Sequence, residues 1–362
     1  FEDIADIVDY AHKFRVRVYV TINTILTDEE LIEVEKLVQK LSKIKIDGII
    51  IQDFGILKLN LPDIRLHAST QCHNNTVEKI KFLENTGFKR VILPREITLE
   101  EIKQIKKETD IELECFIHGA LCVSYSGQCY LSYVNGGRSA NRGECAQPCR
   151  KRYSVYDKHG KCLVKNKYIL SLKDLNLSKR LEELILSGIT SFKIEGRLKD
   201  EDYVTNTTAY YRQKIDKILK KYSLNRSSHG ESEYDFIPDL NKTFNRGYCE
   251  FNIDGHKNNI ATVNYTSSPG EFAGEVLSVK KNRFVIKTDI EMHNADGICF
   301  FDDNGELKGT NINKIEGDMI FPADISGIKS GMKIYRNYDK IFEDKLKNTE
   351  IKRQIPDRKS VV

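Results

Sequence analysis

The sequence has no run of apolar residues long enough to cross a membrane, which takes about 18 residues in succession. We therefore expect no membrane-spanning segment. Lysine and arginine outnumber the acidic residues by only four, 57 against 53, and this small excess does not by itself indicate a nucleic-acid-binding protein. The first residues are acidic and lack the basic and apolar regions of a signal peptide, so we expect a cytoplasmic protein. Because the chain does not begin with methionine, we also expect residues to be missing at its ends.

Several common catalytic signatures are absent as well. There is no His-Glu-x-x-His motif of zinc peptidases, no Gly-x-Ser-x-Gly motif, no Walker phosphate-binding loop and no Gly-x-Gly-x-x-Gly motif. A standard metallopeptidase or serine-peptidase centre is therefore not visible.

Short apolar segments alternate with helical segments over residues 1–222. Six strands are expected, within residues 15–22, 48–52, 64–69, 89–93, 111–117 and 191–195. Two of the intervening helices begin with a capping box, in which Thr27 is followed by Glu30 and Thr98 by Glu101. A further helix is expected within residues 175–186. Strands separated by capped helices are typical of βα units and a parallel sheet.

The chain opens with a helical segment, residues 4–14, that has no strand before it. An N-terminally truncated (β/α)8 barrel of the TIM type explains this segment together with the six units, and an open doubly wound sheet is the alternative. We expect the barrel to span residues 1–222. A cysteine-rich insertion at 119–152 interrupts it.

The remaining residues predict a second, smaller domain. Residues 223–256 are polar and are expected to form a linker or extension. Short β segments within residues 257–340 predict a small all-β domain that resembles a barrel. Residues 341–362 are expected to be a tail that continues beyond the sequence.

Four of the nine cysteines lie close together in the insertion. Cys122, Cys129, Cys145 and Cys149 are spaced C-x6-C-x15-C-x3-C. Thiolates are soft ligands suited to zinc or to iron–sulfur clusters. Structural zinc sites usually combine two short Cys-x2–4-Cys pairs, and only Cys145 and Cys149 have such a spacing here. We favour a 4Fe-4S cluster, with zinc or four unligated thiols as the alternatives.

Basic residues surround these cysteines. The group consists of Arg138, Arg142, Arg150, Lys151 and Arg152, against one acidic residue, Glu144. Such a group predicts a phosphate-bearing partner, and a solvated charged loop is the alternative.

Polar residues also follow several of the expected strands, at the edge where barrel enzymes place their chemistry. His118, Glu195 and Glu96 are candidates for proton transfer, and Arg95 and Arg197 are candidates for binding a carboxylate or phosphate. Because the insertion begins directly after His118, we expect the cysteines to lie over the mouth of the barrel.

Four segments, residues 67–71, 114–132, 191–197 and 244–248, resemble peptidase family U32. The resemblance covers residues 1–256, and the β domain matches more loosely. It implies that the four cysteines of the insertion hold a 4Fe-4S cluster. It also implies an enzyme that uses prephenate and hydroxylates a pyrimidine base without molecular oxygen. The segments look most like the branch of the family that forms 5-hydroxycytidine in rRNA, and next like the branch that hydroxylates tRNA uridine.

The resemblance adds candidates for binding the substrate, namely His67, Gln71 and Lys193, beside Arg138 and Arg142 of the insertion. Two other functions stay open. One is a collagenase-like peptidase, as the family name says, and the other is a non-catalytic RNA-binding factor that contains zinc.

Overall fold

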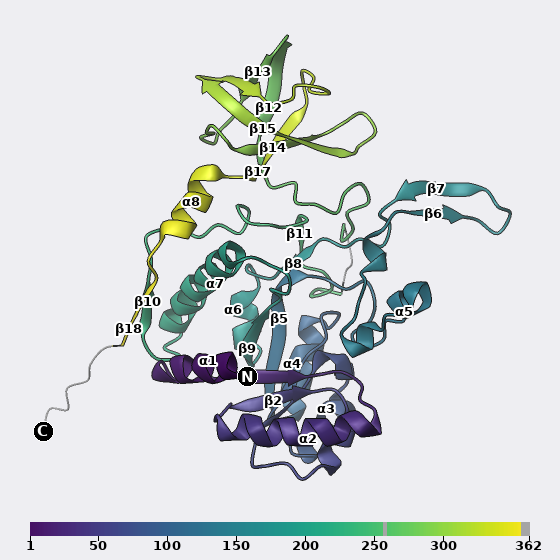
Figure 1. The fold of residues 1–362 in the computed structure, drawn as a ribbon, viewed down its shortest axis with the longest axis vertical. Helices are drawn as coiled ribbons and strands as arrows, with labels where there is room; N and C mark the ends of the chain where they lie inside the picture. Colours follow the sequence, from purple (N-terminus) through teal and green to yellow (C-terminus); the bar gives the residue numbers. More distant parts are fainter. Residues whose placement is uncertain (256–258, 356–362) are drawn as a thin grey trace, which may run out of the picture.

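Six parallel strands form the centre of the larger part of the molecule (Figure 1). The computed structural model describes residues 1–255 and 259–355. In spatial order the six strands are β1 (Tyr19–Ile22), β2 (Gly48–Ile51), β3 (Leu66–Ala68), β4 (Arg90–Ile92), β5 (Glu112–Ala120) and β9 (Ile189–Ile194). Each strand runs parallel to its neighbour, so the prediction of a parallel sheet is confirmed. Within the described residues β1 pairs only with β2 and β9 only with β5, and no closed eight-stranded barrel is seen.

Helices cover this sheet, and a side-chain cap sets the start of four of them. The helices are α1 (Glu2–Lys13), α2 (Asp28–Lys43), α3 (Val77–Asn85), α4 (Leu99–Glu108), α6 (Leu181–Leu186) and α7 (Glu201–Lys221). Both predicted capping boxes are confirmed, at Thr27 before α2 and at Thr98 before α4. Val34, Val38 and Leu41 on one face of α2 are buried, because their spacing of three to four residues directs them all to the sheet.

The second half of β5 pairs with a strand that the sequence analysis did not predict. β8 (Asp174–Asn176) lies antiparallel to residues 118–120 of β5, and β11 (Tyr248–Cys249) continues the sheet beside β8. The helix predicted within residues 175–186 is therefore wrong in its first part and begins only at Leu181. Leu175 and Leu177 are both buried, and this spacing of two is that of a strand. β11 lies within residues 223–256, so part of the expected linker belongs to the main sheet.

Residues 271–338 form a closed antiparallel barrel of six strands, at the top of Figure 1. Its strands are β12 (Glu271–Lys280), β13 (Arg283–Lys287), β14 (Gly297–Phe301), β15 (Leu307–Glu316), β16 (Met319–Pro322) and β17 (Lys333–Tyr338). Alternate residues such as Ile298 and Phe300 point into a separate apolar core. The prediction of a small all-β domain is confirmed.

The chain returns from this barrel to the larger part of the molecule. α8 (Lys340–Asn348) packs Phe342 and Leu346 against Ala209 of α7, and β18 (Lys352–Gln354) pairs with β10 (Glu231–Glu233). Phe342 and Leu346 are one helical turn apart and form one apolar face, so this segment is not the tail that was expected from residue 341. Residues 356–362 of the expected tail lie outside the described residues.

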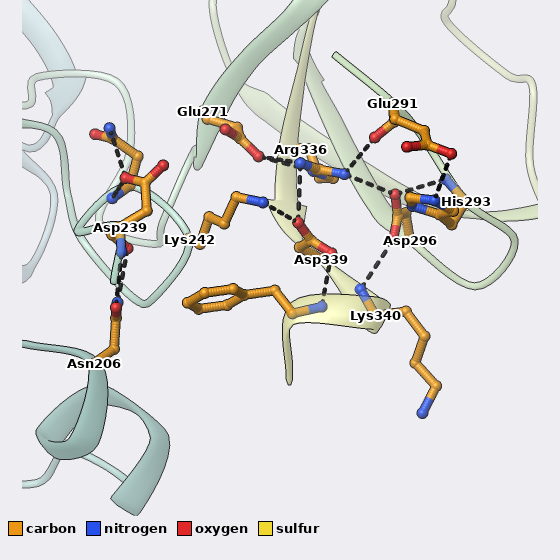
Figure 2. A network of polar contacts seen from close by, with 12 residues as sticks. Asn206, Asp239, Lys242, Glu271, Glu291, His293, Asp296, Arg336, Asp339 and Lys340 are labelled. Atoms are coloured by element: carbon orange, nitrogen blue, oxygen red, sulfur yellow. Dashed lines mark hydrogen bonds and ion pairs between the residues drawn. The ribbon is translucent and has the colours of Figure 1, made fainter. Parts of the chain in front are cut away.

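A buried ion network joins the small barrel to α8. Figure 2 shows Arg336 of β17 between the carboxylates of Glu271, Asp296 and Asp339. Lys242 also contacts Asp339, with 2.7 Å between Nζ and the carboxylate oxygen. Because Asp339 caps α8 by accepting from the backbone N–H of Phe342, the network fixes the start of that helix.

The insertion between β5 and β8 carries short elements. It contains α5 (Leu131–Gly136) and a hairpin of β6 (Tyr153–Tyr156) and β7 (Cys162–Lys167). Two 3-10 turns, η3 (Ala140–Arg142) and η4 (Pro148–Arg150), also lie in the insertion, whereas η1 (Phe54–Lys58) follows β2 and η2 (Thr70–Cys72) follows β3. Among the described helices, none is both long and apolar enough to span a bilayer.

Candidate functional site

A cavity of about 510 Å³ opens where three of the parallel strands end. Arg95 follows β4, Cys122 follows β5 and Glu195 follows β9, and all three line this cavity. Cys145 and Cys149 of the insertion line it as well. The C-terminal edge of a parallel sheet is where α/β enzymes commonly bind ligands. The cavity is therefore the candidate site.

The four cysteines of the insertion are brought together here. Cys129 does not line the cavity, but its charge acts on both Cys122 and Cys149. Burial is the main cause that raises the pKa of the Cys122 and Cys149 thiols, and Arg95 and Arg150 oppose the rise. The backbone N–H of Gln147 donates to the sulfur of Cys145 over 3.3 Å, an interaction that favours a thiolate.

The spacing of the four sulfur atoms bears on which metal they fit. In the described residues, only one group has three possible metal-ligating atoms within 4.8 Å of one another, and it consists of His293, Asp296 and Asp339. No three of the four cysteine sulfurs are therefore that close together. Around one zinc ion, with Zn–S bonds of about 2.3 Å, sulfurs lie roughly 3.8 Å apart. The sulfurs are therefore set wider than a single zinc ion requires.

The loop between Cys122 and Cys129 is fixed by Glu96. The carboxylate of Glu96 accepts from the backbone N–H of Ser126 over 2.8 Å and from its hydroxyl over 3.1 Å. His73 Nδ1 lies 3.5 Å from the same carboxylate. Glu96 is thus directed at the loop rather than into the cavity, and its contacts indicate a positioning residue.

Five cationic side chains line the cavity against two carboxylates. The cations are Arg95, Arg150, Arg197, Lys199 and Arg246, and the carboxylates are Glu195 and Asp200. Arg95 pairs with Glu195 over 2.7 Å and stacks on Phe116, with 3.7 Å between its guanidinium carbon and the ring centre. The guanidinium of Arg197 donates to the carbonyl oxygen of Gly143 over 3.0 Å. The surplus of positive charge favours an anionic occupant.

Arg150 has only neutral hydrogen-bond partners within the described residues. It donates to the hydroxyl of Ser171 over 2.8 Å, to the carbonyl oxygen of Leu121 over 3.2 Å and to the carbonyl oxygen of Leu172. Burial and the nearby charge of Arg246 lower the pKa of Arg150. A cation held this way keeps its charge available to the neighbouring thiols.

Lys199 is a site residue that the sequence analysis missed. Its Nζ lies 3.4 Å from the ring centre of Phe244, and no ion pair of Lys199 is found in the described parts of the chain. Burial, together with Arg246 and Arg150, lowers the pKa of Lys199 to about 8. Its place two residues after Arg197 could have indicated that Lys199 belongs to the site. Arg246 was missed as well, although it lies within residues 244–248, one of the segments that carry the family resemblance.

His118 lies near the cavity but does not line it. It is 1% exposed, and its Nδ1 lies 3.2 Å from the hydroxyl of Tyr211. The rings of Tyr203, Tyr211 and Tyr248 surround it. Burial lowers the pKa of His118 to about 3, so the imidazole is neutral at physiological pH.

The other predicted residues are distributed around the molecule. His67 is buried against Tyr19, and burial together with Arg90 lowers its pKa to about 4. Lys193 Nζ lies 3.9 Å from a carboxylate oxygen of Glu114. Arg138 donates to the carbonyl of Glu144, and Arg142 binds Glu30, whereas Gln71 contacts the loop that carries Cys129 through its backbone. Of the predicted residues, the cavity brings together Arg95, Arg150, Glu195, Arg197 and three cysteines.

The carboxylates of Asp296 and Asp339, with His293, form a second cluster of possible metal ligands. The guanidinium of Arg336 already lies between the two carboxylates, 3.3 Å from Asp296 and 2.9 Å from Asp339. A positive group therefore fills this cluster, and its contacts are those of a structural ion network.

The family model of peptidase family U32 matches residues 1–262. A 23S rRNA 5-hydroxycytidine synthase of Escherichia coli is 40% identical over 98% of this chain and 56% of its own length. The tRNA hydroxylation protein P1 of Bacillus subtilis is 37% identical over 59% of this chain and 53% of its own length. A collagenase of Porphyromonas gingivalis is 29% identical over 87% of this chain and 79% of its own length. The chain thus spans little more than half the length of the first two relatives.

Proposed function

This chain belongs to peptidase family U32, and we propose that it is part of an enzyme that hydroxylates a pyrimidine base in RNA. The observation that carries the proposal is the cavity at the strand ends, where thiols and an excess of cations face the same space. Two relatives whose names describe RNA hydroxylation support it. The rRNA cytidine is the first candidate target, because that relative matches nearly the whole chain, and tRNA uridine is the second.

We propose that Cys122, Cys129, Cys145 and Cys149 hold a 4Fe-4S cluster. No three of the sulfurs are as close as one zinc ion requires, and only Cys145 and Cys149 have the short sequence spacing that structural zinc sites use. The N–H donated to Cys145 and the nearby arginines stabilise anionic sulfur. When bound, such a cluster supplies one-electron redox chemistry.

The cationic residues of the cavity are suited to orient an anionic substrate. Arg95 is already paired with Glu195, and Arg246 with Asp174 over 3.3 Å. Lys199, in the loop after β9, lines the same cavity and has no ion pair within the described residues. Prephenate carries two carboxylates and is the proposed small-molecule co-substrate. Its carboxylates, or an RNA phosphate, would pair with these cations.

Glu195 is the proposed proton-transfer residue, because its carboxylate lines the cavity beside Cys122. His118 is less suited, since it is buried among tyrosines and neutral.

A target base within folded RNA must leave its stack to reach such a cavity. An RNA substrate is also the reason to propose a cytoplasmic location. We further propose that the parallel sheet belongs to a barrel of the TIM type.

Peptide hydrolysis is the second candidate function, because the collagenase relative matches most of this chain and most of its own length. Digestion of gelatin by the purified, metal-loaded protein is the direct test. Hydrolysis that persists in the Cys145→Ala variant would favour a peptidase whose chemistry does not depend on the thiols. An isolated protein that contains zinc and lacks visible absorption would favour a zinc-containing RNA-binding factor.

The main experiment measures hydroxylated nucleosides by mass spectrometry of rRNA and tRNA from a deletion strain. The strain is complemented with the natural gene, with Cys145→Ala, or with Cys162→Ala as a matched control. Cys162 is an exposed cysteine on β7 that does not line the cavity. We expect the natural gene and Cys162→Ala to restore the nucleoside and Cys145→Ala to fail. Unchanged nucleosides in the deletion strain would overturn the proposal.

A further inference from the structure

The β6–β7 hairpin extends away from the body of the molecule as an arm (Figure 1). β6 and β7 pair only with each other among the described strands, and none of residues 151–167 is buried. An isolated hairpin of two strands is marginally stable in water. The arm adds no residue to any of the three apolar clusters of the described chain, so core packing does not account for it.

The arm is strongly basic. Residues 151–167 contain six cations, Lys151, Arg152, Lys158, Lys161, Lys165 and Lys167, and one acidic residue, Asp157. Asp157 is used within the turn, where its carboxylate accepts from the backbone N–H groups of His159 and Lys161.

Most of these cations have no carboxylate partner. Arg152 pairs with Glu306 over 2.8 Å, and Lys167 donates to the amide oxygen of Asn264 over 2.8 Å. Within residues 1–255 and 259–355 the structure gives no ion pair for Lys151, Lys158, Lys161 or Lys165. Unpaired lysines on a protruding ribbon are suited to bind an extended polyanion.

The base of the arm is fixed next to the cavity. Arg150 lines the cavity, and Tyr153 at the start of β6 donates to the carbonyl of Pro148 over 2.8 Å. The pairing of Arg152 with Glu306 and of Lys167 with Asn264 ties the other side to the small barrel and the segment before it. A chain bound along the arm would therefore reach the cavity.

We propose that the β6–β7 hairpin is an RNA-binding arm whose lysines contact phosphates flanking the modified base. The inference rests on the proposed function but concerns a different surface from the cavity. Charge complementarity supports RNA, and Tyr156, which is 60% exposed on β6, offers a ring on which an unpaired base can stack. The arm contributes affinity and register, and the cavity selects the base.

The test compares two variants that each lose three exposed lysines. The arm variant is Lys158→Gln/Lys161→Gln/Lys165→Gln. The control is Lys36→Gln/Lys40→Gln/Lys43→Gln on α2, whose lysines are exposed and lie far from the arm. Binding of the whole metal-loaded protein to an unmodified 23S rRNA transcript is measured at several salt concentrations.

We expect the arm variant to bind more weakly and to lower the slope of log affinity against log salt by about 2, at roughly 0.7 per lost phosphate contact. The control should keep the natural slope, and a Lys→Arg version of the arm variant should restore it. Visible absorption and unfolding temperature should stay unchanged in all variants. An arm variant with the natural slope overturns the proposal.

Complementation of the deletion strain separates this proposal from the proposed function. If the natural gene restores the hydroxylated nucleoside and the arm variant binds rRNA with the natural slope, only the arm proposal is wrong. If the natural protein neither binds rRNA nor restores the nucleoside, both are wrong.

Discussion

A Cβ atom on Gly127 would lie 1.9 Å from the carbonyl oxygen of Gln71. Gly127 lies between Cys122 and Cys129, and Gln71 lies in the turn that follows β3. The loop that carries two of the four cysteines is therefore in direct contact with the edge of the parallel sheet. Only a residue without a side chain permits this approach.

The first prediction concerns this contact. Gly127→Ala should displace the loop, so that the protein no longer acquires visible absorption on anaerobic reconstitution with iron and sulfide. Gly137→Ala is a matched control, because Gly137 has φ of +73° against +74° for Gly127 but no neighbouring atom within 4 Å of its added Cβ. The control should cost only about 1–2 kcal/mol of backbone strain and keep its absorption. Equal loss in both variants would show that backbone conformation, not the contact, decides loading.

The second prediction concerns Lys199. Because its pKa is about 8, Lys199 loses its charge as the pH rises through that value, and binding of prephenate should weaken over the same range. Asp174 and Asp200 favour the charged amine, whereas Arg150 and Arg246 oppose it. Lys199→Arg should extend binding to higher pH, and Lys199→Met should bind weakly throughout. Calorimetric titration at several pH values measures this, and an unchanged pH profile in Lys199→Arg would contradict it.

The third prediction concerns a pair of carboxyl groups between α7 and α8. Glu343 shares a hydrogen bond with Asp202, and burial together with Asp202 raises the pKa of Glu343 from 4.5 to about 8. The folded protein holds this proton more tightly than the unfolded chain does. Stability should therefore fall as the pH rises from 4.5 through about 8.

The variant Glu343→Gln removes this proton and should flatten the dependence of the unfolding temperature on pH. Asp344→Asn, which removes an exposed carboxylate paired with Lys340, is the control and should keep the natural slope. If both variants retain the same slope, Glu343 is not its source.

The fourth prediction concerns the buried network around Arg336. Arg336→Met leaves Asp296 and Asp339 buried without their common cation, and should lower the free energy of unfolding by about 3–5 kcal/mol. Arg152→Met removes an arginine whose partner Glu306 is 34% exposed, and should cost much less. Urea unfolding of the two variants gives the comparison. Similar losses of unfolding free energy in the two variants would show that this buried network stabilises the protein no more than an exposed ion pair does.

Features decided by neighbouring residues could be predicted from the sequence. The capping boxes at Thr27 and Thr98 depend on residues three positions apart, and both formed. The grouping of Cys122, Cys145 and Cys149 was also visible, because the insertion is short and rich in glycine.

Features decided by distant partners could not be predicted. The strand at Asp174–Asn176 exists because the far end of β5 has an unpaired edge, and nothing near Leu175 in the sequence indicates this. His118 follows a strand, as a catalytic residue would, but α7 brings Tyr203 and Tyr211 over it. Lys199 lies in the cavity against Phe244 and Tyr203, and Phe244 is distant from it in the sequence.

The pairing of β10 with β18 has a consequence for cleavage of the chain. The small barrel lies between these two strands in the sequence, and the strands pair with each other outside the barrel. In addition, α8 packs against α7. A protease that nicks a loop of the barrel would therefore leave two fragments that stay associated and co-purify until a denaturant separates them.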